Sequence, residues 1–365
     1  MRITFALPEL SNLAGGLRVV AQYTRHLLDQ GHSVSFAVRR PRHTPNRKRQ
    51  ILNIMGLGRP TPPLEAERGH FAGIDVPVIH LEESRWVRSQ DIPDADAIIS
   101  TFWTTAEWAN RLPPSKGSHI HFIQGYEDFN PEFSKRVRAV YRQNNSKIVV
   151  ASWLKEKLLA EFRQPSRIVM NGVDIAHFKA PPRLRNRTQR IGFLYTTFAD
   201  KNSQMAIEVA KRVRHLRPDI DFVAFGTPPR PDDLPNFISY ERSPDQDRIP
   251  SIYGSCDLWL FVTRSEGFGL PILEAMACRT PVIATPAGAA PDLINGRNGI
   301  MSSLDPAEFT KAVLEFLSLP SERWTDYSEA AHQTARCRSL THAAHDFEAA
   351  VHFFCGIENR LAHTG

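Results

Sequence analysis

A strand–loop–helix–strand unit at residues 257–285 constrains the fold of this chain more than any other stretch. An apolar run at 257–263 is followed by a glycine loop at 265–270, then by a helical pattern and a second apolar run. The alternation of short strands with helices predicts an α/β fold with a parallel sheet. Because such sheets bind ligands beyond the carboxyl ends of their strands, the loop is predicted to lie where a ligand binds.

The residue types in this loop indicate what the ligand is. Gly267 and Gly269 have no Cβ, so the backbone can approach a ligand closely and present its amides. Pro271 suits the first turn of a helix, and a helix N-terminus is a ready site for phosphate. Glu266 in the loop and Glu274, expected in the first helical turn, can accept hydrogen bonds from sugar or ribose hydroxyls. The alternative is that Glu274 only complements the helix dipole and Glu266 is a solvated loop residue.

The chain begins with a similar unit. A strand at 2–7, a loop with Gly15 and Gly16, a helix at 17–30 and a strand at 33–38 are expected in that order. In this context the glycine pair predicts a loop that contacts phosphate or sugar, and a simple tight turn is the alternative. A dehydrogenase is disfavoured, because the pair lacks the Gly-x-Gly-x-x-Gly spacing and no acidic residue closes the second strand.

The length of 365 residues predicts two domains. Further strands are expected at 76–80, 97–101, 119–123, 147–151, 167–170, 190–195 and 221–226. Further helices are expected at 48–55, 132–144, 153–162, 203–216, 250–256, 306–317, 321–337 and 341–360. The polar, proline-containing segment 175–189 is the best linker candidate. We therefore expect an N-terminal domain at 1–172, a C-terminal domain at 173–340, and a terminal helix within 341–365 that packs back toward the N-terminal domain.

The positive charge is concentrated in the first half of the chain. The whole chain carries +6, whereas residues 1–172 carry +8 and the remainder −2, with the excess gathered at 39–49. This asymmetry suggests an anionic partner such as a membrane face or a lipid phosphate, and a solvated loop is the alternative. Nucleic acid is disfavoured because no recognition motif accompanies the charge.

Two absences in the sequence indicate the compartment. No apolar run reaches the length of about 18 residues that would span a membrane. The four cysteines have no metal-ligand spacing and are typical of a reducing compartment: Cys256, Cys278, Cys337 and Cys355. A cytoplasmic protein is expected, with peripheral association with the inner face of the membrane as a further expectation.

The second half, from about 148 to 315, resembles the GT-B nucleotide-sugar glycosyltransferases of family 4, which mostly retain configuration. The landmarks occur in the family's order: Asn171-Gly172-Val173-Asp174 with Phe178, Lys201, the Glu266/Glu274 pair, 280–285 and 296–299. The first half is similar in architecture only, although its loop Gln124-Gly125-Tyr126-Glu127 is similar to that of some rhamnosyl-type members.

This resemblance implies two Rossmann-like domains that face each other across a cleft. It implies that Lys201 holds the donor diphosphate, Glu266 contacts the donor sugar, and Glu274 holds the ribose. The catalytic candidates are Glu266, Lys201, Gln124 and Glu127. The donor-binding candidates are Gly15, Gly16, Thr196, Thr197, Lys201, Glu266, Gly267, Phe268, Gly269, Leu270 and Glu274.

The chain departs from the family pattern at several places. The family has Gly-Arg where this chain has Tyr195-Thr196-Thr197, so a second diphosphate cation is missing there. Threonine hydroxyls can bond phosphate but bring no charge. The family often has a histidine in the loop 124–127, whereas here His119 and His121 lie just before it. Arg279 replaces a common glycine.

The sequence predicts sugar transfer without a metal or cofactor. Three Asp-x-Asp triplets occur, at 94–96, 219–221 and 245–247, but none ends an apolar strand as a metal site of this kind requires. A retaining reaction, which the resemblance implies, strictly needs no protein base. An inverting one would need a base, for which Glu127 and Asp128 are the candidates, although both could be surface loop carboxylates.

We therefore expect a hexosyl- or deoxyhexosyl-type glycosyltransferase. It would move sugar from a nucleoside diphosphate to a glycan or lipid-linked acceptor in polysaccharide or glycoconjugate biosynthesis. Two alternatives stay open: a nucleotide-sugar epimerase on the same scaffold, and a non-catalytic GT-B partner subunit.

Overall fold

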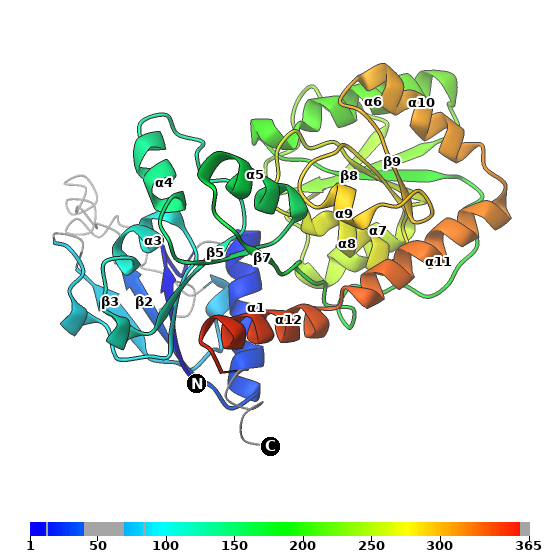
Figure 1. Ribbon diagram of the computed structural model, residues 1–365. Helices are drawn as coiled ribbons and strands as arrows, with labels where there is room; N and C mark the ends of the chain where they lie inside the picture. Colours follow the sequence, from blue (N-terminus) through cyan, green and yellow to red (C-terminus); the bar gives the residue numbers. More distant parts are fainter. Residues whose placement is uncertain (12–13, 40–68, 83–84, 358–365) are drawn as a thin grey trace, which may run out of the picture. The chain divides into compact units, whose positions relative to one another are not determined.

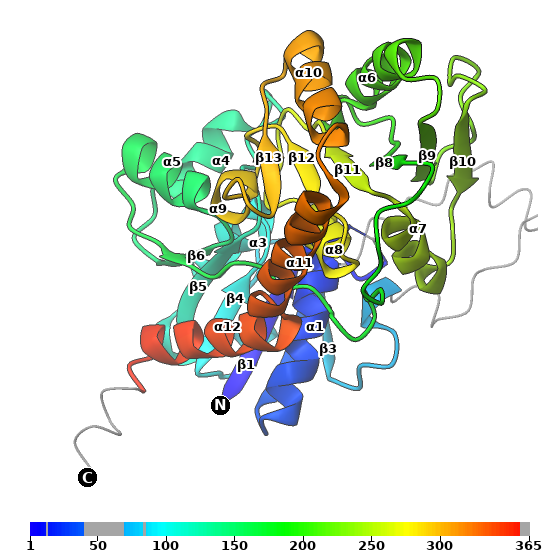
Figure 2. The same ribbon diagram turned by 90° about the vertical axis from the view of Figure 1, so that its right-hand side faces the viewer.

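The chain divides into two compact units. The computed structural model describes residues 1–11, 14–39, 69–82 and 85–357 (Figures 1 and 2). The N-terminal unit comprises Met1–Val149, Lys155–Val169 and Ala344–Gly365, and the C-terminal unit comprises Val150–Leu154 and Met170–Ala343. The main change of unit thus follows Val169, three residues before the position expected from the sequence. The expected helix at 48–55 and residues 40–49 of the basic run lie outside the described residues.

The N-terminal unit is built on a parallel sheet with the strand order β3-β2-β1-β4-β5-β6-β7. Its strands are mostly buried on both faces, which explains why they read as continuous apolar runs. The strands are β1 Arg2–Leu7, β2 Ser33–Arg39, β3 Val78–Leu81, β4 Ala97–Ser100, β5 Ser118–Ile123, β6 Ser146–Val149 and β7 Arg167–Ile168. The helices are α1 Gly15–Asp29, α3 Trp103–Ala109, α4 Ser134–Tyr141 and α5 Ser152–Phe162, with short 3-10 turns η2 Gly69–Phe71, η3 Ser89–Asp91 and η4 Pro114–Lys116.

The C-terminal unit has a second parallel sheet, in the order β10-β9-β8-β11-β12-β13. The strands are β8 Arg190–Leu194, β9 Asp221–Gly226, β10 Ile238–Arg242, β11 Leu258–Phe261, β12 Val282–Ala284 and β13 Gly299–Met301. The helices are α6 Ser203–Leu216, α7 Ile249–Ser255, α8 Leu270–Ala277, α9 Ala290–Leu293, α10 Pro306–Leu317 and α11 Ser321–Cys337, with 3-10 turns η5 Ala199–Lys201 and η6 Gln246–Arg248. The last helix, α12 Leu340–Phe354, begins in this unit and belongs to the N-terminal unit from Ala344 onward. The parallel α/β class predicted from the sequence is confirmed.

Four described helices and strands were not predicted, and each has a weak sequence signal. The helix α9 is only four residues long. The strand β10 lies at the sheet edge and has one fully buried residue, so its run is mostly polar. The strand β13 is only three residues long. The helix α3 is rich in aromatic and β-branched residues, which are poor helix formers. Among the described helices, none combines the length and apolar character that crossing a bilayer requires.

The last helix, α12, contributes a core side chain to the N-terminal unit from Ala344 onward. Phe347 is fully buried. Its ring centroid lies 4.7 Å from that of Tyr23, 5.0 Å from Phe122 and 6.3 Å from Phe5. Because these rings belong to α1, β5 and β1, the end of the chain helps to complete a core that the first 149 residues begin.

Truncation of this ring is expected to destabilise the N-terminal unit. Phe347→Ala removes a fully buried ring and should lower the free energy of unfolding by about 3–5 kcal/mol. The matched control is Phe353→Ala on the same helix, where the ring is 53% exposed and the loss should be under about 1 kcal/mol. Urea unfolding followed by circular dichroism measures both, and equal losses would contradict this packing.

Candidate functional site

The C-terminal sheet reverses its strand order beside β8. From β8 the chain moves outward to β9 and β10, then returns to place β11 on the other side of β8. In open parallel sheets, ligands bind at such a reversal, outside the carboxyl ends of the two strands. The loops concerned are residues 195–202 after β8 and residues 262–269 after β11. The structure therefore brings together the loops that carry Lys201 and Glu266, two residues that the resemblance assigns to one donor.

An ion pair joins the two loops. The Lys201 ammonium donates a hydrogen bond to the Glu266 carboxylate, and both side chains are partly buried. The backbones meet as well, since the Arg264 N–H donates to the Asp200 carbonyl oxygen at 2.7 Å. A cation and a carboxylate, both predicted as site residues, thus lie in direct contact at the reversal point.

The glycine loop has the backbone that its sequence predicted. Gly269 precedes α8 with φ +97°, a left-handed conformation, and Pro271 lies in the first turn of α8. The Phe268 side chain is buried, and its carbonyl oxygen accepts from the Ala289 N–H at 2.7 Å. Phe268, one of the predicted donor-binding residues, can therefore contact a ligand only through its backbone N–H.

Glu274 lies deeper than the sequence suggested. It is the fifth residue of α8 and not part of the first turn, so the interpretation that it only complements the helix dipole is wrong. The side chain is buried, and the Tyr253 hydroxyl donates to its carboxylate at 2.9 Å. Tyr253 thus fixes the orientation of Glu274, and no motif in the sequence pointed to this role.

Thr196 and Thr197, which stand where the resemblance implies Gly-Arg, lie in the loop after β8. The Thr196 N–H donates to the Ser203 hydroxyl at 2.9 Å, and the Thr196 hydroxyl accepts from the Phe198 N–H. Thr197 is exposed. Arg264, on the adjoining loop, is exposed, and its backbone N–H bonds to Asp200, the residue before Lys201. The sequence analysis did not identify this cation.

In the N-terminal unit the structure brings Gly16 and Gln124 together. The Gln124 side-chain amide donates to the Gly16 carbonyl oxygen at 3.0 Å. A Cβ at Gly16 would lie 3.2 Å from that amide nitrogen, so the approach favours glycine. Gly15 is the first residue of α1, which follows β1 at the point where this sheet also reverses, between β1 and β4.

Glu127 is not the surface carboxylate that one interpretation expected. It is buried, and it accepts a hydrogen bond from the first N–H of α3, at Trp103, at 2.7 Å. Its own N–H donates to the Tyr141 hydroxyl at 3.0 Å. Burial raises the pKa of Glu127 to about 8, although the Trp103 N–H opposes this shift. The geometry favours a role in positioning α3.

The two histidines before this loop belong to the interior of β5. His119 contacts Ser100 at 2.9 Å and Asn145 at 3.2 Å, and burial lowers its pKa to about 3. His121 is fully buried against the Tyr141 ring, and burial lowers its pKa well below the ordinary value. Neither histidine therefore takes the place of the one that the family has in the loop.

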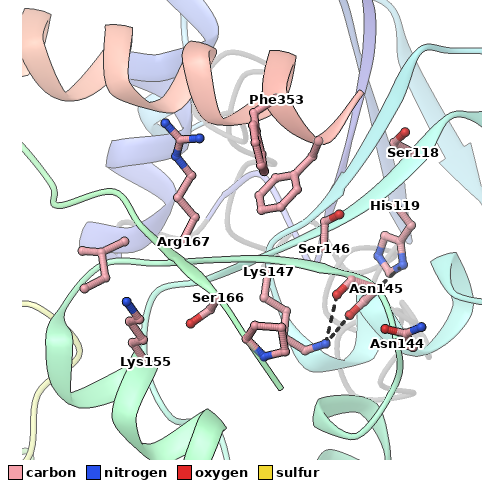
Figure 3. Close-up of a pocket in the computed structure, with 13 residues that line it drawn as sticks. Ser118, His119, Asn144, Asn145, Ser146, Lys147, Lys155, Ser166, Arg167 and Phe353 are labelled. Carbon is pink, nitrogen blue, oxygen red and sulfur yellow. Dashed lines mark hydrogen bonds between the residues drawn. The ribbon is translucent and has the colours of Figure 1, made fainter. Parts of the chain in front are cut away.

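A cavity of about 930 Å³ lies at the opposite edge of the N-terminal sheet, at the amino ends of β5, β6 and β7 (Figure 3). Inside it, the Lys147 ammonium donates to the Gln143 carbonyl oxygen at 2.5 Å and the Asn145 side-chain oxygen at 2.6 Å. Burial lowers the pKa of Lys147 to about 8. Because Gly16 and Gln124 lie at the carboxyl ends of β1 and β5, this cavity is separate from the candidate site.

The comparisons agree with this geometry. Residues 188–318 match the family model described as "Glycosyl transferases group 1". The segment includes β8, β11 and both loops of the candidate site.

Curated relatives match over part of their length. D-inositol 3-phosphate glycosyltransferase 2 of Catenulispora acidiphila is 33% identical over 100 residues, 27% of this chain and 23% of that protein. Sulfoquinovosyl transferase SQD2 of Arabidopsis thaliana is 24% identical over 209 residues, 52% of this chain and 40% of that protein. The chain thus spans less than half the length of these relatives.

Solved structures match over nearly the whole chain. Anabaena Alr3699/HepE in complex with UDP aligns with a TM-score of 0.73 and 15% identity, covering 96% of this chain and 99% of that one. A glycosyltransferase from Rickettsia africae aligns with a TM-score of 0.71 and 16% identity, covering 97% and 98%. The fold is therefore of the GT-B class, as predicted.

The left-handed backbone at Gly269 can be tested by substitution. Gly269→Ala should lower the free energy of unfolding by roughly 2–4 kcal/mol, because φ is +97° and the new Cβ would lie 2.9 Å from the Phe261 ring. The matched control is Gly296→Ala in the same unit, with φ +81° and nothing within 4 Å, which should cost roughly 1 kcal/mol. Urea unfolding compares them, and a Gly296 loss as large as that at Gly269 would contradict the loop geometry.

The raised pKa of Glu127 predicts a pH dependence of stability. Between the ordinary value of 4.5 and about 8, the folded state holds a proton that the unfolded state has released. The stability of the N-terminal unit should therefore fall as pH rises through this window. Between pH 5 and 8, the free energy of unfolding of the wild type should fall by on the order of a few kcal/mol relative to that of Glu127→Gln, which cannot ionise. Parallel pH profiles for the two proteins would contradict the buried carboxyl.

Proposed function

We propose that this chain is a glycosyltransferase that moves a hexosyl or deoxyhexosyl group from a nucleoside-diphosphate sugar to a glycan or lipid-linked acceptor. The observation that carries the proposal is the contact between Lys201 and Glu266 at the reversal point of the C-terminal sheet, with Glu274 on the adjoining helix. A diphosphate needs a cation, and sugar and ribose hydroxyls need carboxylate acceptors. The residue types present match those needs.

The proposed binding mode begins with exchange of the ion pair. In the ligand-free chain Lys201 and Glu266 neutralise each other. When the donor binds, Lys201 turns to the diphosphate and Glu266 accepts hydroxyls of the sugar. The amides at the start of α8 face the same charge, and Glu274, oriented by Tyr253, accepts the ribose hydroxyls. Arg264 is our candidate for the second cation that the loop 195–197 lacks.

We propose that the reaction proceeds with retention and without a metal. The bond between the anomeric carbon and the leaving phosphate oxygen breaks while the acceptor oxygen bonds to the same face. The acceptor proton passes to the leaving phosphate, so no protein base is needed. The contacts of Glu127 support this choice, because its buried carboxylate accepts the first N–H of α3 and is thereby engaged in positioning that helix. Stabilisation of the leaving group then rests on cations and amides.

The donor and setting are proposed from what the similar proteins are described as doing. Anabaena Alr3699/HepE was solved with UDP, which favours a UDP-sugar as the first donor to test. The relative from Catenulispora is named for a phosphorylated acceptor, D-inositol 3-phosphate, which is compatible with an anionic acceptor. We propose a role in polysaccharide or glycoconjugate biosynthesis in the cytoplasm, with the basic N-terminal unit binding a lipid-linked acceptor or an anionic membrane surface.

The role of Glu274 predicts a selective loss of donor binding. In a thermal-shift panel of UDP, GDP, dTDP and ADP sugars, at least one donor should stabilise the wild type. Glu274→Gln should lower the affinity for that donor by on the order of 10–100-fold, because a charged hydrogen-bond acceptor is lost. The exposed Glu315→Gln on α10 is the control and should bind as the wild type does.

Turnover then separates transfer from other chemistries. With donor and acceptor present, Lys201→Met should lower kcat by about 10²–10³-fold. Conversion of the donor without any acceptor would indicate an epimerase. Binding of no nucleotide sugar, or an unchanged Glu274→Gln protein, would remove the proposal.

A further inference from the structure

Four histidines and one glutamate gather in the N-terminal unit, on α1, the turn after it, and α12. We name this group the histidine cluster; its members are His26, His32, His345, Glu348 and His352. Both ribbon views show α12 crossing α1 (Figures 1 and 2). The cluster lies toward the end of α1, whereas Gly15 and Gly16 lie at its start, so it is separate from the candidate site.

Glu348 is the centre of the cluster. One carboxylate oxygen lies 2.8 Å from His26 Nε2, and the other lies 2.8 Å from His32 Nε2. Each of these histidines has a second one beside it. The ring centroids of His26 and His345 are 4.5 Å apart, and those of His32 and His352 are 5.4 Å apart. The cluster therefore consists of two three-residue groups that share one carboxylate.

The spacing along α12 produces this arrangement. His345 and His352 lie three residues before and four residues after Glu348, so all three share one face of the helix. Glu348 already has a histidine on each oxygen, so the two additional imidazoles are not needed to satisfy it. Their positions instead add a third donor atom to each group, and in each group the three donors lie within 4.8 Å of one another.

The donor separations suit a metal ion. Imidazole nitrogens and carboxylate oxygens bind Zn²⁺ at about 2.0–2.2 Å, so tetrahedral donors lie about 3.4 Å apart. In the first group the existing separations to the Glu348 oxygen, 2.8 Å from His26 and 3.9 Å from His345, bracket that value. An ion could enter with shifts of about half an ångström per donor. Mixed imidazole and carboxylate donors favour borderline transition cations over Mg²⁺.

The burial of the donors points the same way. The side chains of His26, His32 and Glu348 are 12%, 8% and 15% exposed, whereas His345 is 56% exposed. The site therefore has a mostly buried floor and one open side through which an ion and its remaining water ligands could pass. Enclosure of this kind limits solvent access to a bound ion.

We propose that the histidine cluster binds a divalent transition cation of the Zn²⁺ type, at up to two ions per chain bridged by Glu348. His26 and His345 hold one position, and His32 and His352 hold the other. A bound ion ties α12 to α1 within the N-terminal unit and so stabilises the packing of the last helix. This inference is independent of the glycosyl-transfer proposal, because none of the five residues belongs to the donor site.

The experiment uses the full chain without a histidine tag, at about pH 7.5. Zn²⁺ is titrated by calorimetry, and the melting temperature is measured with Zn²⁺ and with Mg²⁺. We expect saturable Zn²⁺ binding at one or two ions per chain and a rise in melting temperature that Mg²⁺ does not reproduce. Co²⁺ should show the visible absorption bands of a nitrogen- and oxygen-coordinated ion.

Two variants separate metal binding from the existing hydrogen bonds. The double variant His345→Ala/His352→Ala leaves the His26 and His32 contacts with Glu348 intact. It should lower the affinity for Zn²⁺ at least tenfold and abolish the rise in melting temperature. The control is His342→Ala, an exposed histidine on the same helix, which should bind Zn²⁺ as the wild type does. Absence of saturable Zn²⁺ binding, equal effects of Mg²⁺, or wild-type affinity in the double variant would overturn the proposal.

Discussion

The constraint on which this structure depends is the position of β8 between β9 and β11. Because all three strands are parallel, the loops that follow β8 and β11 must emerge at the same edge and meet. That meeting places Lys201 beside Glu266 and brings the start of α8 next to both. The cation, the carboxylate and the backbone amides of the proposed donor site are therefore brought together by the strand order and not by any single motif.

Burial then separates carboxylates that look equivalent in the sequence. Glu266 is partly exposed and held by a cation, and Glu274 is buried and held by a tyrosine hydroxyl, so both can accept from a ligand. Glu127 is also buried, but it accepts from a helix amide and its pKa rises to about 8. The three carboxylates differ in their hydrogen-bond partners. Because Glu127 accepts from the first N–H of α3, we assign it to positioning that helix.

The sequence predicted features that depend on neighbouring residues. Strands covered on both faces appeared as apolar runs, and the turn at Gly269 with Pro271 behind it was readable because both residues have conformational requirements. Contacts between distant segments could not be read in this way. The Tyr253–Glu274 bond and the Arg264 backbone contact join residues from different elements. The histidine cluster has a helical spacing within α12, but its approach to His26 and His32 depends on the fold. The edge strand β10 was missed because half-exposed polar residues carry little apolar signal.

The most direct test of the donor site is a crystal structure of the chain with UDP bound. The proposed donor site predicts that the diphosphate displaces Glu266 from Lys201 and that the ribose hydroxyls lie within hydrogen-bond distance of Glu274. It would be contradicted by a nucleotide bound elsewhere, for example in the cavity beside Lys155 and Arg167, with Lys201 still paired to Glu266.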